Sequence, residues 1–185
     1  MIYLLTRVSL AATIFVSALP SIATSVLAPD FDGMVRRADL IFTGRVTGQR
    51  AEWRKFDGQR SIVTLVRFEV LGIHKGQAGR NVELQFLGGK IGEASLHVDA
   101  MSKFHVGERA VLFVEQNGVN ASPLVGFFHG KFNVLTDNSV AHHNGEPLSD
   151  VAEIGKARLK RATGPRAMSH DDFAGTIRGK AKKTN

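Results

Sequence analysis

Residues 86–114 read FLGGKIGEASLHVDAMSKFHVGERAVLFV, and the fold expected of this chain depends on how this stretch is interpreted. It starts in an apolar alternation over 82–87 and ends in an apolar run over 110–114, bounded by Gly107 and Glu115. That run is too short for a buried helix and predicts a central strand covered on both faces. A long connection between two strands is usually functional or folds back as a lid. We therefore expect this one to form a binding rim, made by Gly88, Gly89, Lys90, Gly92, Met101, Lys103 and Phe104.

A long hairpin is expected before this stretch. Residues 40–46 and 61–73 both alternate with the period of a strand, and Asp57-Gly58 between them is a strong hairpin signal. Gly44 and Gly48 are expected on one face of the first strand, where missing side chains let a strand bend. The second strand is expected to be covered on both sides at its first end and to face water on one side at its other end.

A third strand is expected over 82–87, with Val82, Leu84 and Phe86 inward and Glu83 and Gln85 outward.

After residue 114, Asn117-Gly118 marks a turn, and the stretches 123–128 and 131–135 predict a fifth strand broken near Gly130. Five strands, a bent first strand and an insertion between strands three and four match a five-stranded, OB-like Greek-key barrel over residues 31–142. The fold class is therefore mainly β, with short C-terminal helices. A small two-sheet sandwich is the alternative.

Helices are expected only at the two ends of this unit. Residues 30–39 predict a short helix with Asp30 or Asp32 as its N-cap. Residues 148–161 and a segment after Ser169 predict two amphipathic helices, which either dock on the barrel or stay free of it.

The first 28 residues have the three-part plan of a secretory signal. Arg7 precedes an apolar region over 8–19, and small residues follow it. We expect a signal peptide over residues 1–23, cleaved after Ala23, and an exported protein that is periplasmic or secreted. An uncleaved membrane anchor is the alternative. The chain has 0 cysteines, which fits a bacterial envelope better than a disulfide-rich secretome.

The net charge of +7 is unevenly placed. Residues 29–152 hold 14 basic and 14 acidic residues, whereas residues 153–185 hold 9 basic and 3 acidic ones. The barrel is therefore not expected to bind nucleic acid specifically, and the basic C-terminal tail, residues 148–185, is the part that would contact an anionic surface.

Several stretches resemble a group of small exported bacterial β proteins without assigned activity. They are ADLIFTGRV (38–46), VTLVRFEVLGIHKG (63–76), FLGGKIG (86–92), MSKFHVGERAVLFV (101–114) and PLVGFFHGKFNV (123–134). More distantly, their order is similar to the netrin-like, OB-type module of tissue inhibitors of metalloproteinases. That resemblance implies the barrel and a protease-related protein partner. It does not imply the inhibitor mechanism, because that family binds the protease zinc through an N-terminal cysteine.

Chemical motifs give little support to catalysis. His142 and His143 are adjacent and would point to opposite faces of a strand, so only His97, His105 and His129 could converge on a metal. No cofactor is expected. The preferred function is a non-catalytic exported binding or interaction module of the envelope, and the alternative is a metal-dependent or hydrolytic envelope enzyme that uses histidines.

Overall fold

The structure is a computed structural model that describes residues 28–156 and 167–184. The signal peptide expected over residues 1–23 lies outside the described residues. In chain order the elements are α1 (Phe31–Arg37), β1 (Leu40–Phe56), β2 (Gln59–Lys75), β3 (Asn81–Leu87), β4 (Gly89–Ile91), β5 (Ala94–Leu96), β6 (Arg109–Val114), β7 (Lys131–Val134), β8 (Val140–His142), the 3₁₀ turn η1 (Val151–Glu153) and α2 (His170–Thr184).

Six of the strands form one antiparallel sheet in the order β3-β2-β1-β6-β7-β8, and β4 pairs with β5 in a separate hairpin. The expectation of a mainly β fold is confirmed. The closed five-stranded barrel is not what these pairings form, because in the described part of the chain β3 and β8 are edge strands of an open sheet. Strands β4, β5 and β8 have 3 residues each, too few for an alternation pattern to predict them.

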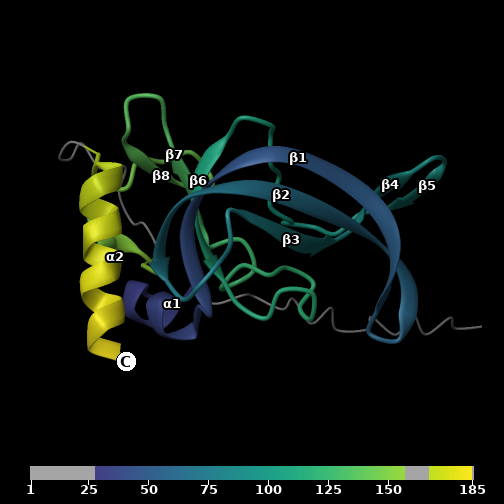
Figure 1. Ribbon diagram of the computed structural model, residues 1–185, viewed down its shortest axis with the longest axis horizontal. Helices are drawn as coiled ribbons and strands as arrows, with labels where there is room; N and C mark the ends of the chain where they lie inside the picture. Colours follow the sequence, from purple (N-terminus) through teal and green to yellow (C-terminus); the bar gives the residue numbers. More distant parts are fainter. Residues whose placement is uncertain (1–27, 157–166, 185) are drawn as a thin grey trace, which may run out of the picture.

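The hairpin of β1 and β2 forms the long curved ribbon seen in Figure 1, and each strand has 17 residues. Its loop is Asp57-Gly58, with φ of 48° and 75°, and a type I′ turn requires positive φ at both positions. The hairpin prediction is therefore confirmed. The pairing register shifts between Val46 and Gly48, and a bulge of this kind bends and twists a strand.

The two glycines of β1 do not share a face, as the sequence pattern predicted, because the bulge at Thr47 reverses the alternation. Gly44 pairs with Val70 and Gly48 with Arg67, which lie on opposite faces of β2. A Cβ atom at Gly44 would lie 2.6 Å from a ring carbon of Phe42, whereas one at Gly48 would meet nothing within 4 Å. Only Gly44 is therefore needed to let a neighbouring side chain pack closely against the backbone.

Strand β6 is buried on both faces, as its apolar run predicted. Its alternate residues enter two different hydrophobic clusters. Val111 and Phe113 pack with α1 and α2, and Ala110, Leu112 and Val114 pack with β1, β2 and β3. The sheet is thus covered on one face by the helices and on the other by its own curvature and the connection that contains Phe104.

The register expected for β3 is correct, since Leu84 and Phe86 are 0% and 2% exposed. Gln85 points to the other face but is only 7% exposed, so it does not face water. Its amide oxygen accepts a hydrogen bond from Arg54 at 3.0 Å, and its backbone N–H donates to Asn117 at 3.0 Å. The loop after β6 therefore covers this part of the outer face.

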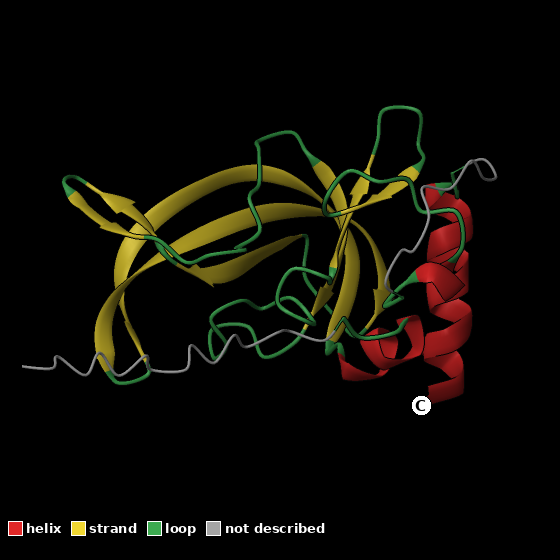
Figure 2. Cartoon of the chain, turned by 180° about the vertical axis from the view of Figure 1, so that it is seen from behind, coloured by secondary structure: helices red, strands yellow, loops and turns green. Residues whose placement is uncertain are grey.

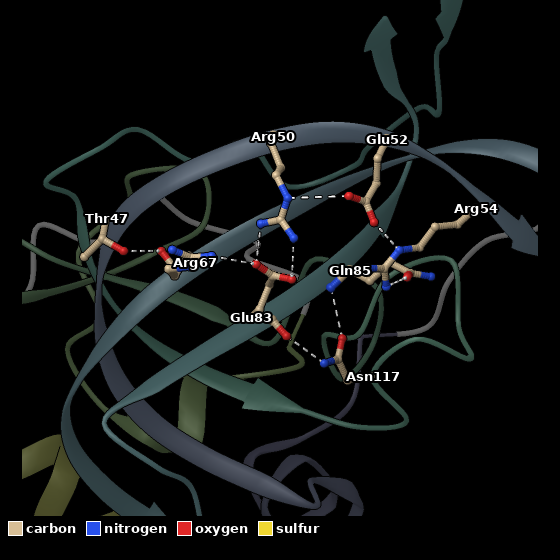
Figure 3. Close-up of polar contacts among 8 residues, drawn as sticks. All are labelled: Thr47, Arg50, Glu52, Arg54, Arg67, Glu83, Gln85 and Asn117. Atoms are coloured by element: carbon tan, nitrogen blue, oxygen red, sulfur yellow. Dashed lines mark hydrogen bonds and ion pairs between the residues drawn. The ribbon is translucent and has the colours of Figure 1, made fainter.

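A group of ionic side chains covers the same face (Figure 3). Arg50 donates to Glu83 at 2.5 and 3.1 Å and lies 3.5 Å from Glu52. The hydrogen bond from Arg50 holds the pKa of Glu83 below its usual range. Exposed ion pairs stabilise little by charge, but Leu65 lies opposite Arg50 on β1 and Gln85 on β3 and is 2% exposed. The aliphatic stems of the arginines can cover such apolar residues while their charged ends stay in water.

Both helices lie at one end of the molecule (Figure 2). The Asp30 side chain caps α1 by accepting a hydrogen bond from the N–H of Gly33 at 2.7 Å, as predicted. Phe173 and Ile177 of α2 are 0% exposed and join the helix-side cluster. Of the two outcomes left open by the sequence, the described part of α2 therefore shows docking.

Two further local predictions are wrong. Residues 123–128 do not form a strand, because Gly126 and Phe127 have φ of 66° and 71° and turn the chain after a single bridge at Leu124. The helix expected over 148–161 is reduced to η1 in its described part, and residues 157–161 lie outside the described residues.

In the described part of the chain, no helix combines the length and the apolarity needed to cross a membrane.

Candidate binding site

Gly88 and Gly89 fasten the β4–β5 hairpin to β2. Their φ values are 104° and 140°, in a region that side chains rarely adopt. The N–H of Gly88 donates to the carbonyl of Ile62 at 2.8 Å, and the Thr64 hydroxyl donates to the carbonyl of Gly88 at 2.7 Å. A Cβ atom at Gly89 would lie 2.6 Å from the hydroxyl oxygen of Thr64. These two glycines of the predicted rim therefore have a structural role.

The hairpin itself projects from the end of the curved ribbon, opposite the helices (Figure 1). Ile91 pairs with Ala94, so its loop has two residues, and Gly92 has a φ of 57° at the first loop position, where a type II′ turn favours glycine. Lys90 and Gly92 are exposed. The hairpin thus presents a cation and a tight turn to its surroundings.

A groove of about 850 Å³ runs beside this hairpin, between β4–β5 and residues 97–105. Six of the seven residues predicted as a rim line the groove, and Gly92 at the hairpin tip does not. The six are Gly88, Gly89, Lys90, Met101, Lys103 and Phe104. The structure thus brings together residues that the sequence joined only by their place in one connection.

The lining residues contribute differently to the groove. Phe104 is 4% exposed, and its ring packs on Phe68 and Phe86 with centroids 5.4 and 5.2 Å apart, so it belongs to the core. Met101 is half-buried beside the same cluster, whereas the Lys103 side chain is exposed. The groove therefore has an apolar floor and cationic edges.

Lys131 holds the connection in place, and sequence reasoning missed it. This lysine is 6% exposed, and its ammonium group donates to the carbonyl of Lys103 at 2.6 Å. The same group lies 2.6 Å from a carboxylate oxygen of Glu108 and 4.4 Å from the centre of the Phe104 ring. A lysine at the start of an otherwise buried strand is the signal that would have indicated it, because lysine is almost never buried without a partner.

A second pocket, of about 1140 Å³, lies on the other side of residues 100–105. Its remaining walls are the start of β6, the residues from β7 to the turn that follows it, and the rings of Phe128 and His143. No sequence pattern predicted this pocket, because its residues come from separate parts of the chain that only the fold brings together.

The histidines do not converge as the enzyme alternative requires. His97 and His105 both line the groove, where His97 lies 3.1 Å from a carboxylate oxygen of Asp99, whereas His129 packs against Phe128 and His143. His105 also lines the larger pocket. Within residues 28–156 and 167–184, no group of three or more histidine, aspartate or glutamate side chains is placed to hold a metal ion.

Burial lowers the pKa of His129 and of His143, and the positive charge of Lys131 lowers that of His143 further. Both rings are therefore neutral at neutral pH and act as aromatic surface.

Comparison of the chain with protein-family models, with curated proteins and with solved structures gave no match in any of the three.

Proposed function

We propose that this chain is an exported, non-catalytic interaction module of the bacterial envelope, which binds a protein partner in the groove beside the β4–β5 hairpin. The observation that carries the proposal is the common location of Lys90, Met101 and Lys103 around one groove with an apolar floor. Apolar surface with a polar, charged rim is the usual composition of a protein interface.

The sheet edges favour side-chain recognition over strand addition. The Asn117 side chain accepts from the N–H of Gln85 at 3.0 Å and donates to the carbonyl of Glu83 at 2.9 Å, so it occupies the edge of β3. At the other edge, the N–H of His142 donates to the carbonyl of Glu146 at 2.8 Å. Edges covered in this way are poor templates for a partner strand.

The OB-like relationship and a protease-related partner belong to the same proposal. The pairing of β1 with both β2 and β6 and the position of the hairpin in the connection between β3 and β6 support the OB-like relationship. The protease-related partner follows from that relationship and has no separate observation behind it. Because the chain has 0 cysteines, a partner protease would not be inhibited through a cysteine on its zinc. The enzyme alternative is less well supported, since His129 lies apart from His97 and His105 and no three ligand side chains among the described residues are placed to hold a metal ion.

A capture experiment from envelope extract tests the proposal. The bait is the mature protein starting at Thr24, and the intact mass of the exported protein checks that start. Lys90→Glu places a negative charge on the rim, and Lys55→Glu is its matched control, because both lysines are exposed on strands and only Lys90 lines the groove. We expect Lys90→Glu to lose the captured protein and Lys55→Glu to retain it. Both variants should unfold within about 0.5 kcal/mol of the wild type, since exposed substitutions rarely cost more.

Equal capture by the wild type and Lys90→Glu would remove the groove from the proposal. Lys103 is not used, because it borders both pockets and a change there would not separate them.

A further inference from the structure

The larger pocket contains buried polar atoms without hydrogen-bond partners. Among the described residues that line the pocket, these are the hydroxyl oxygen of Ser102, Oε1 of Glu108, Nε of Arg109 and the amide oxygen of Asn133. Oε1 of Glu108 lies beside the ammonium group of Lys131, so the other three atoms remain without a partner. Buried polar groups in folded proteins are nearly always paired, and an unpaired one calls for an explanation such as a ligand. Three residues around one cavity thus have unsatisfied hydrogen-bonding groups, which a rotation of their side chains would turn towards a bound molecule.

The pocket also carries positive charge that its own carboxylate does not balance. Glu108 lies 2.6 Å from the ammonium group of Lys131, so these two neutralise each other. This leaves Arg109 and Lys103 as the surplus cations. The contact found for the Arg109 guanidinium in the described part of the chain is one at 3.5 Å to the amide oxygen of Asn138, which is uncharged.

Strand pairing keeps Arg109 in this position. It is the first residue of β6 and pairs with Val134 on β7 and with Arg45 on β1. Arg45 has its own partner, since it donates to Glu69 at 3.2 Å. Two arginines side by side across strands repel each other, and only one of them has a carboxylate, so an anion beside Arg109 would relieve the repulsion.

The rest of the wall is apolar or aromatic. The rings of Phe128 and His143 pack at an interplanar angle of 58° with centroids 4.6 Å apart, and Val134 and Leu135 lie in the same wall. The pocket volume of about 1140 Å³ exceeds what a simple inorganic ion fills and is at the upper end of small-molecule sites.

We propose that this pocket is a binding site for a small organic anion. Its carboxylate or phosphate group pairs with Arg109 and Lys103, an N–H or O–H group donates to the amide oxygen of Asn133, and its ring or hydrocarbon part lies against Phe128 and His143. This site does not depend on the hairpin groove, because Arg109, Asn133 and Phe128 line only the larger pocket.

Calorimetric titration with four probes tests the site. The probes are 3-hydroxybenzoate, 3-hydroxyphenyl phosphate, the neutral 3-hydroxybenzamide and inorganic phosphate. We expect saturable binding of at least one of the two organic anions, with the amide at least about tenfold weaker because it lacks a charge-assisted bond to arginine. The stronger of the two anions then identifies the acidic group as carboxylate or phosphate.

Variants locate the binding. Arg109→Gln should weaken the binding of the more tightly bound anion by at least about tenfold. Arg80→Gln makes the same charge change on an exposed turn that lines neither pocket, and it should leave the affinity unchanged. If Arg109→Gln melts at a lower temperature than the wild type, Phe128→Leu provides a second readout, because Phe128 lines only the larger pocket and forms the aromatic wall of the proposed site.

Equal binding of the acid and the amide would overturn the proposal, as would binding that survives both variants. Absence of saturable binding by either organic anion would overturn it too and would leave ordered water as the occupant of the pocket.

Discussion

Gly89 and Gly92 lie three residues apart in the same connection and both have positive φ, but the structure uses them differently. Gly89 has a φ of 140° and no room for a Cβ atom beside Thr64, whereas Gly92 has a φ of 57° and nothing within 4 Å. Asparagine is found at the positive-φ positions of tight hairpin turns such as the one at Gly92, whereas a φ near 140° is open almost only to glycine. Asparagine placed at either position in turn therefore distinguishes the anchoring glycine, Gly89, from the turn glycine, Gly92.

We expect Gly89→Asn to lower the free energy of unfolding by about 2 to 4 kcal/mol, because backbone strain and overpacking each cost roughly 1 to 3. Gly92→Asn should change it by less than about 1 kcal/mol. Urea unfolding of the two variants measures the difference. If both lost the same stability, the anchoring of the hairpin through Gly89 would be wrong.

At the scale of elements, α2 is attached to the sheet by a chain of hydrogen bonds in which each group donates to the next one. An arginine only donates, so at 3.3 Å from Arg178 the Nδ1 atom of His74 accepts, and Nε2 of His74 carries the proton. That Nε2 donates to the Thr43 hydroxyl at 2.7 Å, and the hydroxyl donates to Nε2 of His170 at 2.8 Å. The chain ends at Asp171, 3.2 Å from Nδ1 of His170. It requires both imidazoles to be neutral.

Acid should therefore destabilise the docking of α2. Burial lowers the pKa of His74 to about 4, and the charges of Arg178 and His170 act in the same direction. The unfolded chain binds this proton near pH 6.5, so the stabilisation is fully present above about 6.5 and is lost as the pH falls towards about 4. His74 alone changes the free energy of unfolding by at most about 1.4 kcal/mol per pH unit. His129 and His143, whose pKa values are also lowered, contribute further changes of the same sign.

Urea unfolding at about pH 7 and about pH 4.5 measures this dependence. His74→Gln should show a smaller loss between the two pH values than the wild type. His97→Gln should behave as the wild type, because the His97 side chain is 84% exposed. An unchanged pH dependence in His74→Gln would show that the acid sensitivity arises elsewhere.

The sequence was sufficient to predict most strands, but not the features whose structure depends on tertiary contacts. The strands β1, β2, β3 and β6 were predicted because their alternation and the Asp57-Gly58 loop are local signals. The segment over 123–128 has the same apolar composition as a strand, but it is buried as a turn, which composition alone does not distinguish. In the site, the glycines and Lys90 were found through their shared connection, whereas Arg109 and Asn133 were missed because only the pairing of β6 with β7 brings them together.

At the scale of the whole molecule, the β4–β5 hairpin, which borders the groove, and helix α2 lie at opposite ends (Figures 1 and 2). The β4–β5 hairpin forms one end, and α2 forms the other, with Arg178, Lys182 and Lys183 exposed on its surface. This separation would let the chain hold a protein partner at the groove while the helix contacts an anionic surface, and we propose that α2 has this second contact.

Vesicles of phosphatidylcholine with and without phosphatidylserine test the helix contact. We expect the double variant Lys182→Gln, Lys183→Gln to bind the anionic vesicles roughly thirtyfold more weakly than the wild type, since each lysine near such a surface contributes about 1 kcal/mol. The control Lys55→Gln, Arg80→Gln makes the same charge change on exposed positions outside α2 and should bind as the wild type. Wild-type binding should also fall steeply between about 50 and about 200 mM salt, because the Debye length shortens.

Truncation after Val151 is unsuitable as a test of this contact, because it would remove Ile154, Phe173 and Ile177 from the core. Binding that survives both the salt and the double variant would place the anionic contact on the sheet and exclude α2 as its source.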